Sequence, residues 1–375
     1  MAMRQLEKLL LLITLMGLGF CPSLMEGKKE NSNDFIGDVN VKQLRKMAWK
    51  YNVTSLLVFG DSSVDPGNNN FLPTTMKSNF PPYGKDFFNA RPTGRFCDGR
   101  LATDFIAEAL GFGETVPAFL DRTLKPIELL HGVSFASASS GYDDLTANYS
   151  NVLSLPKQLE YLMHYKLHLK RQVGGEKAEK IIRNAIVVIS MGTNDFLENY
   201  FLEPLRPKQF TLDQYQNFLV SSMYRNVQVM HRLGVRRLVV VGVPPLGCMP
   251  VVRTITNQNT TCSKVFNQAA YAFNAKMKLK LAGIKASLGM LTSFVDAYAI
   301  VQAAVQNPTA YGLRETARGC CGTGLVEYGE TCKGSPTCTD PQNYVFWDAV
   351  HPSQKMYKIL AAQAIQSVQH DILSS

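Results

Sequence analysis

Several classes of protein are excluded by what this sequence lacks. The first apolar run, residues 9–20, is twelve residues long and no later segment is long and apolar enough, whereas a bilayer span needs about 20 residues. No block of five or six basic residues and no zinc-finger, RRM or basic-zipper signature occurs, which argues against nucleic acid as a partner. Charged residues are only 18% of the chain, and 27 Gly and 18 Pro among 375 residues fall short of the excess typical of disorder. What remains is a folded globular chain of enzyme size.

The N-terminus predicts export. Arg4 and Lys8 precede the apolar run of residues 9–20. A basic leader followed by a short apolar segment is typical of a secretory signal peptide rather than of a transmembrane anchor. We therefore predict a secreted, extracellular protein with a signal peptide over residues 1–25, an N-terminal extension over residues 26–49 and a single domain over residues 50–372.

The net charge is positive, with 39 Lys and Arg against 30 Asp and Glu, or +9 at neutral pH. Without a nucleic-acid motif, this excess favours contact with an acidic cell-surface or cell-wall matrix. The densest basic stretch, residues 164–171, has its charges at helical spacing and is interpreted as a solvated helix face.

Cysteine usage agrees with export. Four of the seven cysteines beyond the predicted signal peptide lie within 19 residues, among Gly and Pro, where cross-links would substitute for a hydrophobic core. A zinc site formed by these thiols and His351 is the alternative, but an exported chain is oxidised and no C-x₂-C pair is present. We expect Cys320 and Cys321 to pair with Cys332 and Cys338 in either combination, and Cys248 with Cys262, which leaves Cys97 as the odd thiol. Three sequons, at Asn52, Asn148 and Asn259, are candidate glycosylation sites on surface loops.

The alternation of apolar runs with amphipathic stretches predicts an α/β fold. Five runs have strand length: residues 54–59, 133–136, 185–190, 237–241 and 290–295. Continuous β-branched runs are typical of parallel strands that are buried on both faces. A helix is predicted to begin after Thr211, which forms a capping box with Gln214, and to end at Gly234, and a closing helix is predicted over residues 353–372, after Pro352. This pattern predicts a mainly parallel sheet with helices on both faces.

Small polar residues follow the predicted strands. Ser62 comes after the first strand, residues 137–141 after the second, and Asn194 after the third, while Asp348 and His351 lie near the C-terminus. Ligands of such sheets bind at the carboxyl ends of the strands. Each residue alone has a structural interpretation, as a helix cap or as a half-buried histidine beside an aspartate. Together, a serine, an amide donor and an Asp-x-x-His pair are the parts of an acyl-transfer site.

Four segments then point to a family. FGDSSVDPGNNN, GVSFASASSGYD, SMGTNDF and FWDAVHP resemble, in order, the four signature blocks of the plant-type GDSL esterase/lipase family in the SGNH hydrolase superfamily. The resemblance implies a flavodoxin-like three-layer α/β/α fold with a five-stranded sheet. It also implies an ester hydrolase of the cell wall or apoplast that acts on acyl esters or lipids and uses no metal or other cofactor. It further implies that Ser62 is the nucleophile, that Asp348 and His351 complete the triad, and that Asn194 is an oxyanion-hole donor.

The chemistry of these residues fits those roles. A serine hydroxyl needs a base such as His351, and Asp348 can hold the imidazole in the required tautomer. No G-x-S-x-G sequence occurs, which disfavours the nucleophile elbow of α/β-hydrolases. The backbone N–H groups of Ser62 and Ser139 are further candidate oxyanion donors. Ser139 stands where the family usually has glycine, and a serine there is strained if the position requires positive φ.

Two alternative functions are compatible with the same residues. The same site would serve an extracellular acyltransferase if an alcohol replaced water, or the chain would be a non-catalytic cell-wall binding protein if Ser139 silenced the site. Aromatic residues of the loop over residues 71–92 are expected either to line an acyl groove or to pack locally. These residues are Phe71, Phe80, Tyr83, Phe87 and Phe88.

Overall fold

The computed structural model describes residues 35–258 and 260–374. The predicted signal peptide, residues 1–25, and the candidate glycosylation site Asn259 lie outside these ranges. Within them, no helix is both long enough and apolar enough to cross a bilayer. The chain from Phe35 onward forms one compact unit.

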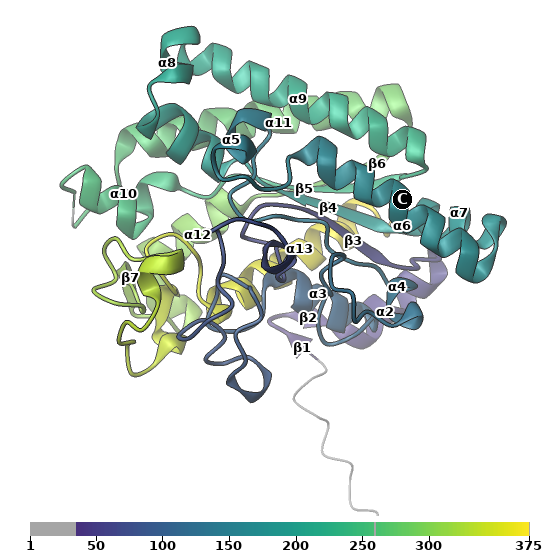
Figure 1. Cartoon of the computed structure of the whole chain (residues 1–375), viewed down its shortest axis with the longest axis horizontal. Coiled ribbons are helices and arrows are strands. Elements are labelled where there is room, and N and C mark those ends of the chain that lie inside the picture. Colours follow the sequence, from purple (N-terminus) through teal and green to yellow (C-terminus); the bar gives the residue numbers. More distant parts are fainter. Residues whose placement is uncertain (1–34, 259, 375) are drawn as a thin grey trace, which may run out of the picture. The chain divides into compact units, whose positions relative to one another are not determined.

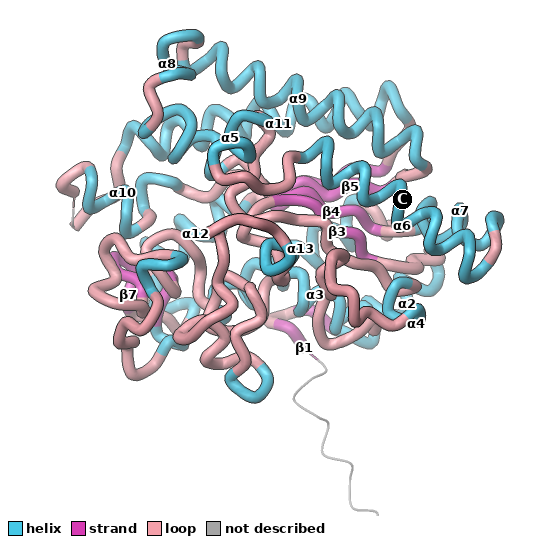
Figure 2. Tube along the Cα trace, in the orientation of Figure 1, coloured by secondary structure: helices cyan, strands magenta, loops and turns pink. Residues whose placement is uncertain are grey.

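Four parallel strands form the central sheet. They are β3 (Leu56–Gly60), β4 (Ile186–Ser190), β5 (Arg237–Val241) and β6 (Leu291–Val295), hydrogen-bonded in that order (Figures 1 and 2). Val58 pairs with Val188, and Val188 pairs with Val239. Four of the predicted strands are confirmed within two residues at each end, and every residue of β3 and β4 is buried, as their continuous apolar sequence indicated.

The fifth predicted strand, residues 133–136, is extended but is not a regular strand. Val58 donates its backbone N–H to Val133 (3.0 Å), and Phe135 donates to Val58 (2.7 Å), so the segment lies against the free edge of β3. Ser137 also donates to the Gly60 carbonyl (3.0 Å), but only Ser134 forms a bridge pair with β3, because the Gly60 N–H bonds to the Gln158 side chain instead of to this segment. With this segment included, the chain order across the sheet is 2-1-3-4-5, the flavodoxin-like order.

Helices cover both faces of the sheet. Successive side chains of a strand point to opposite faces, so alternate residues of β3 enter different core clusters. Leu57 and Phe59 enter one core cluster, whereas Leu56 and Val58 enter another. The first cluster is covered by α6 (Leu155–Val173), α7 (Gly175–Asn184), α9 (Leu212–Leu233) and α11 (Lys264–Leu288), and the second by α2 (Val41–Lys50), α3 (Ala102–Leu110) and α13 (Gln354–Asp371) (Figure 1). The result is a three-layer α/β/α arrangement.

Shorter elements connect these layers. The remaining α-helices are α4 (Pro126–Leu129), α5 (Asp144–Tyr149), α8 (Leu205–Gln209), α10 (Pro250–Ile255) and α12 (Ala297–Gln306). Two small sheets pair β1 (Phe35–Ile36) with β2 (Val39–Asn40) and β7 (Glu315–Gly319) with β8 (Tyr344–Phe346). A π-helix, η3 (Asp195–Leu202), follows β4.

The predicted helix ends are confirmed. Thr211 caps α9 by accepting a hydrogen bond from the Gln214 N–H, and the Gln214 side chain accepts one from the Thr211 N–H. Gly234 ends the same helix in the left-handed conformation. Ser353 caps α13 through the Met356 N–H, so Pro352 lies just before the cap rather than in the first turn.

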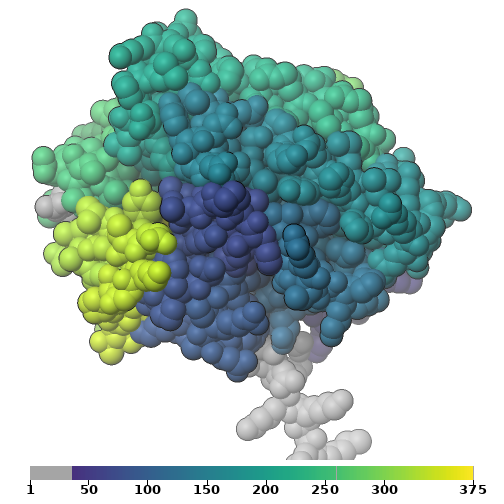
Figure 3. Space-filling model, in the orientation of Figure 1, coloured from purple at the N-terminus to yellow at the C-terminus, as the bar shows by residue number. Residues whose placement is uncertain are grey.

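Three disulfides are present: Cys248–Cys262, Cys320–Cys338 and Cys321–Cys332, while Cys97 is a buried thiol. The four clustered cysteines therefore bond to one another. Figure 3 shows the yellow C-terminal part of the chain lying against the blue part, where Lys85 donates hydrogen bonds to Thr337 and to the Cys338 carbonyl. Two sequon asparagines are exposed, although Asn148 lies on α5 rather than on a loop; Asn52 follows α2 in a turn, and glycosylation of both stays a prediction.

Replacing both Cys321 and Cys332 by alanine is expected to lower the free energy of unfolding by about 2–4 kcal/mol, the usual effect of opening a short cross-linked loop. Activity should fall as well, because the Cys321 N–H donates to the Trp347 carbonyl, directly before Asp348. Denaturant unfolding and an ester assay measure both effects. Alkylation of the denatured, unreduced protein is the control, and it should label Cys97 but none of the six bonded cysteines.

Candidate active site

The candidate residues meet at the carboxyl edge of the sheet. Ser62 follows β3 and Asn194 follows β4, and these two strands flank the point where the chain order 2-1-3-4-5 reverses direction. Such a reversal opens a crevice at the strand ends, where flavodoxin-like sheets bind their ligands. Gly60 permits the tight exit from β3, because its φ is +152° and a Cβ there would lie 2.1 Å from the Ser190 carbonyl oxygen.

Ser62, His351 and Asp348 form one hydrogen-bonded chain. The Ser62 Oγ lies 2.8 Å from His351 Nε2, and His351 Nδ1 lies 2.8 and 2.9 Å from the two carboxylate oxygens of Asp348. A carboxylate accepts, so Nδ1 carries the hydrogen and Nε2 presents a lone pair to the serine hydroxyl. Ser62 and His351 are 289 residues apart in the sequence. The three side chains are therefore brought together by the fold and arranged as a base-activated nucleophile.

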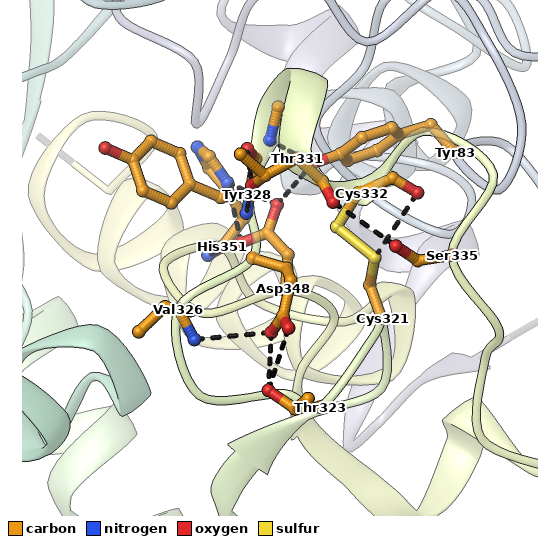
Figure 4. The surroundings of a disulfide bond; sticks show 12 residues. Tyr83, Cys321, Thr323, Val326, Tyr328, Thr331, Cys332, Ser335, Asp348 and His351 are labelled. Carbon is orange, nitrogen blue, oxygen red and sulfur yellow. Dashed lines mark hydrogen bonds and ion pairs between the residues drawn. A yellow bond between two sulfur atoms is a disulfide. The ribbon is translucent and has the colours of Figure 1, made fainter.

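Asp348 is held from several sides. It is fully buried, and its Oδ1 accepts the backbone N–H groups of Val350 (2.8 Å) and His351 (2.7 Å). Its Oδ2 accepts the hydroxyl of Tyr83 at 2.7 Å, which in turn accepts the Gly329 N–H. Burial and the Asp348 charge raise the pKa of the Tyr83 phenol well above its usual value, so this group stays a donor. Figure 4 shows Tyr83, Asp348 and His351 beside the Cys321–Cys332 disulfide.

Tyr83 was among the aromatic residues considered for an acyl groove, and the structure gives it a different place. Its side chain is buried, in edge-to-face contact with Phe96 and Trp347. None of the five aromatic residues considered lines the cavities described below, so an acyl groove at these residues finds no support; Tyr83 packs locally, whereas Phe71 is exposed. Phe96, which the sequence did not single out, packs on the His351 ring at 4.9 Å between centroids.

Three N–H groups near Ser62 are free to bind an oxyanion. Among the described residues, the backbone N–H groups of Ser62 and Ser139 donate to no partner. The Asn194 amide donates one hydrogen to the Ser140 carbonyl at 2.9 Å and has a second one left. Ser139 has φ +68°, the left-handed conformation that glycine adopts more readily. The strain expected from a serine at this position is therefore present.

Buried carboxylates position the loop that carries Ser139. Asp65, from the segment after Ser62, accepts the Ala138 N–H at 3.0 Å, and Asp195 accepts the N–H groups of Tyr142 and Asp143. Burial raises the pKa of Asp65 to about 6 and that of Asp195 to about 7. The sequence identifies neither role, although each residue lies in one of the four family segments, because nothing in the sequence shows which loop a carboxylate reaches.

Two cavities meet at the triad. A cleft of about 60 Å³ is lined by six polar side chains, those of Ser62, Ser139, Asn194, Glu198, Tyr328 and His351, and by apolar ones that include Leu197, Leu202, Val252 and Ile255. A second cavity of about 120 Å³ extends between the sheet and the helices α3 and α13, with valine, leucine, isoleucine and alanine along most of its wall. Ser62 and His351 line both, so a bond broken at Ser62 would have a cleft with several polar side chains on one side and the mainly aliphatic cavity on the other.

Metal binding finds no support in the side chains. In the described part of the chain, no group of three or more His, Cys, Asp or Glu is placed to hold an ion. The cysteines that could have bound zinc are disulfide-bonded.

Comparison with known proteins places this site in a family. The model of the GDSL-like Lipase/Acylhydrolase family matches residues 56–364. A GDSL esterase/lipase of Arabidopsis thaliana is 54% identical over 335 residues, which cover 89% of this chain and 93% of the relative. The chain belongs to the GDSL esterase/lipase family. Its superfamily is that of the SGNH hydrolases, and it is a carboxylic ester hydrolase.

Two further matches were found. A second Arabidopsis thaliana GDSL esterase/lipase is 43% identical over 334 residues, covering 87% of this chain and 89% of that protein. Among solved structures, a catalytic mutant of Axe2, an acetylxylan esterase from Geobacillus stearothermophilus, matches with a TM-score of 0.37 and 15% identity, covering 84% of this chain and 94% of that one.

Proposed function

We propose that this hydrolase is exported to the cell wall or apoplast and cleaves carboxylic esters of acyl lipids or small acylated metabolites through a Ser62 acyl-enzyme. The observation that carries the proposal is the unbroken hydrogen-bonded chain from Ser62 through His351 to Asp348, placed between a cleft with several polar side chains and an aliphatic cavity. Export is supported by the predicted signal peptide and by the three disulfides.

The reaction proceeds in two halves. Ser62 Oγ attacks the ester carbonyl carbon while His351 Nε2 takes the hydroxyl proton, and Asp348 stabilises the imidazolium that forms. The carbonyl oxygen becomes an oxyanion and binds the N–H groups of Ser62, Ser139 and Asn194. Collapse breaks the bond to the alcohol oxygen, which receives the proton from His351. Water then attacks the acyl-enzyme by the same route and releases the acid.

The apolar cavity is the place for the acyl chain. Its wall is mostly aliphatic, so an alkyl chain that enters it loses contact with water, at a gain of about 0.8 kcal/mol per buried methylene. The alcohol product leaves after the first half-reaction and has to reach solvent. We therefore place the alcohol half of the ester in the cleft.

Filling this cavity is expected to shorten the accepted acyl chain. Ala364 and Ala362 are both on α13 and both 7% exposed, but only Ala364 lines the cavity. Ala364→Leu should lower kcat/KM for p-nitrophenyl octanoate about tenfold or more while p-nitrophenyl acetate is affected little. Ala362→Leu is the matched control for overpacking, which costs roughly 1–3 kcal/mol of stability. Equal chain-length profiles for the two variants would place the acyl chain elsewhere.

The proposed function is tested by incubating the purified chain with p-nitrophenyl butyrate and identifying the modified residue by mass spectrometry. A butyryl group on Ser62, with free butyrate as the product, is the expected result. A butyryl ester formed only when an acceptor alcohol is added would assign acyl transfer instead. N-terminal sequencing of protein recovered from the apoplast tests export, and the first residue should lie between positions 21 and 28.

A further inference from the structure

Glu198 is a polar side chain of the cleft that the reaction described above does not use. It lies on η3, the π-helix that begins directly after Asn194, and π-helical turns are frequent at functional sites. The side chain is half-buried and lines the cleft together with Ser62 and His351. The π-helix thus places a carboxyl group next to the proposed oxyanion hole.

The carboxyl group of Glu198 is held by one hydroxyl. Ser139 Oγ lies 3.1 and 3.2 Å from its two oxygens and also 2.9 Å from Ser150 Oγ. Ser139 is the residue in the strained left-handed conformation. Glycine would relieve that strain, but it has no hydroxyl and could not form the hydrogen bond to Glu198. The residue that departs from the family's glycine therefore serves as the anchor for Glu198.

Most of the acceptor capacity of Glu198 is unused. A carboxylate has about four lone-pair sites, and among the described residues only the Ser139 hydroxyl donates to this one. No Lys, Arg or His of the described ranges forms an ion pair with it; Arg206, on the neighbouring α8, pairs with Asp143. The remaining lone-pair sites of this half-buried carboxyl group have no donor among the described residues, and a substrate in the cleft can supply one.

We propose that Glu198, held by Ser139, is a specificity-determining residue that binds a free hydroxyl on the alcohol half of the ester and disfavours a carboxylate there. The selected substrates are acyl esters of polyols, such as partial glycerides or acylated sugars. The inference rests on the proposed function, because it assigns the alcohol half to the cleft. A site that hydrogen-bonds a substrate hydroxyl discriminates strongly against the analogue that lacks it.

The ionisation of Glu198 makes this selection pH-dependent. Burial, and to a lesser extent the charge of Asp61, raise the pKa of Glu198 to about 7, while the hydrogen bond from Ser139 lowers it. Asp61, Tyr328 and His351 are the other titratable groups around it, and burial raises the pKa of Asp61 to about 6. As pH rises through 7, the carboxyl group gains its charge, so repulsion of an anionic substrate increases.

Three butyrate esters with the same acyl group test the proposal: glyceryl monobutyrate carries hydroxyls, propyl butyrate carries none, and 3-butyryloxypropanoate carries a carboxylate. The wild type should prefer the glyceryl ester over the propyl ester about tenfold in kcat/KM. Its relative rate on the carboxylate ester should fall from pH 6 to pH 8.

Glu198→Ala should lose both effects, whereas Glu198→Gln should keep the hydroxyl preference and lose the pH-dependent rejection.

Two further variants separate this role from a structural one. Ser139→Ala removes the hydroxyl that lowers the pKa of Glu198, so the midpoint of the pH effect should move upward. Glu203→Gln removes an exposed carboxylate just after η3, outside the cleft, and should change neither preference nor pH profile.

The possible failures are distinguishable. If the wild type hydrolyses propyl and glyceryl butyrate equally well, or if Glu198→Ala keeps the preference, the role of Glu198 is wrong and the esterase proposal stands. A larger gain with butyrylcholine than with the glyceryl ester would mean a cation site and would also overturn it. If none of the esters is cleaved and Ser62 is not acylated, the proposed function itself fails.

Discussion

Ser62→Ala is expected to lower kcat for ester hydrolysis by up to about 10⁶-fold, because the members of such a triad act as a unit, and to leave only the residual catalysis that the oxyanion hole and substrate binding provide. His351→Ala should cost about as much, since the hydroxyl then has no base at 2.8 Å. The double variant should be no worse than either single one. Rates with p-nitrophenyl butyrate, and mass-spectrometric loss of the acyl-enzyme, measure the effect.

Ser63 provides the matched control for the nucleophile. Its hydroxyl donates to Asp61 Oδ1 at 2.7 Å and contacts Ser190 Oγ at 2.8 Å, and neither of these is the catalytic base. Ser63→Ala should therefore keep its turnover within about tenfold of wild type, and its main effect should be a loss of stability of roughly 1 kcal/mol for each of the two hydrogen bonds. If Ser63→Ala abolished activity and Ser62→Ala did not, the nucleophile would be assigned to the wrong serine.

The features that the sequence predicts well depend on neighbours in the chain. The ends of α9 follow from the side chain of Thr211, three positions from Gln214, and from the conformational freedom of Gly234. The four strands of the sheet follow from runs of buried aliphatic residues. The segment over residues 133–136 pairs irregularly with β3, because the Gly60 N–H bonds to the Gln158 side chain instead, and the apolar pattern does not show that partner.

The site divides in the same way. Ser62, Asp348, His351 and Asn194 lie in motifs whose chemistry is recognisable residue by residue. The Tyr83 hydroxyl reaches Asp348 across 265 positions, and Ser139 reaches Glu198 across 59. Tyrosine in an aromatic loop and glutamate after an Asn-Asp pair carry no local sign of these partners, because only the fold brings them together. The residues that position the triad and shape the cleft therefore required the structure, while the reacting residues did not.

Asn194→Ala is expected to lower kcat by about 10²–10³-fold with little change in KM. The oxyanion exists only around the transition state, so loss of its donor appears in turnover rather than in substrate binding. Unlike the backbone N–H groups of Ser62 and Ser139, the amide of Asn194 is lost on truncation. Steady-state kinetics with p-nitrophenyl butyrate separate kcat from KM.

Truncation of Asn194 also removes its hydrogen bond to the Ser140 carbonyl, so a structural effect has to be separated from a catalytic one. Asn226 on α9 is the matched control: it is 8% exposed like Asn194, and its amide donates to the Ser222 carbonyl at 3.0 Å. Asn226→Ala should lower the unfolding free energy by a similar amount, about 1 kcal/mol, and leave kcat unchanged. If Asn194→Ala raised KM alone, or matched Asn226→Ala in every measurement, its amide would bind substrate or hold the loop, and the oxyanion would depend on the two backbone N–H groups.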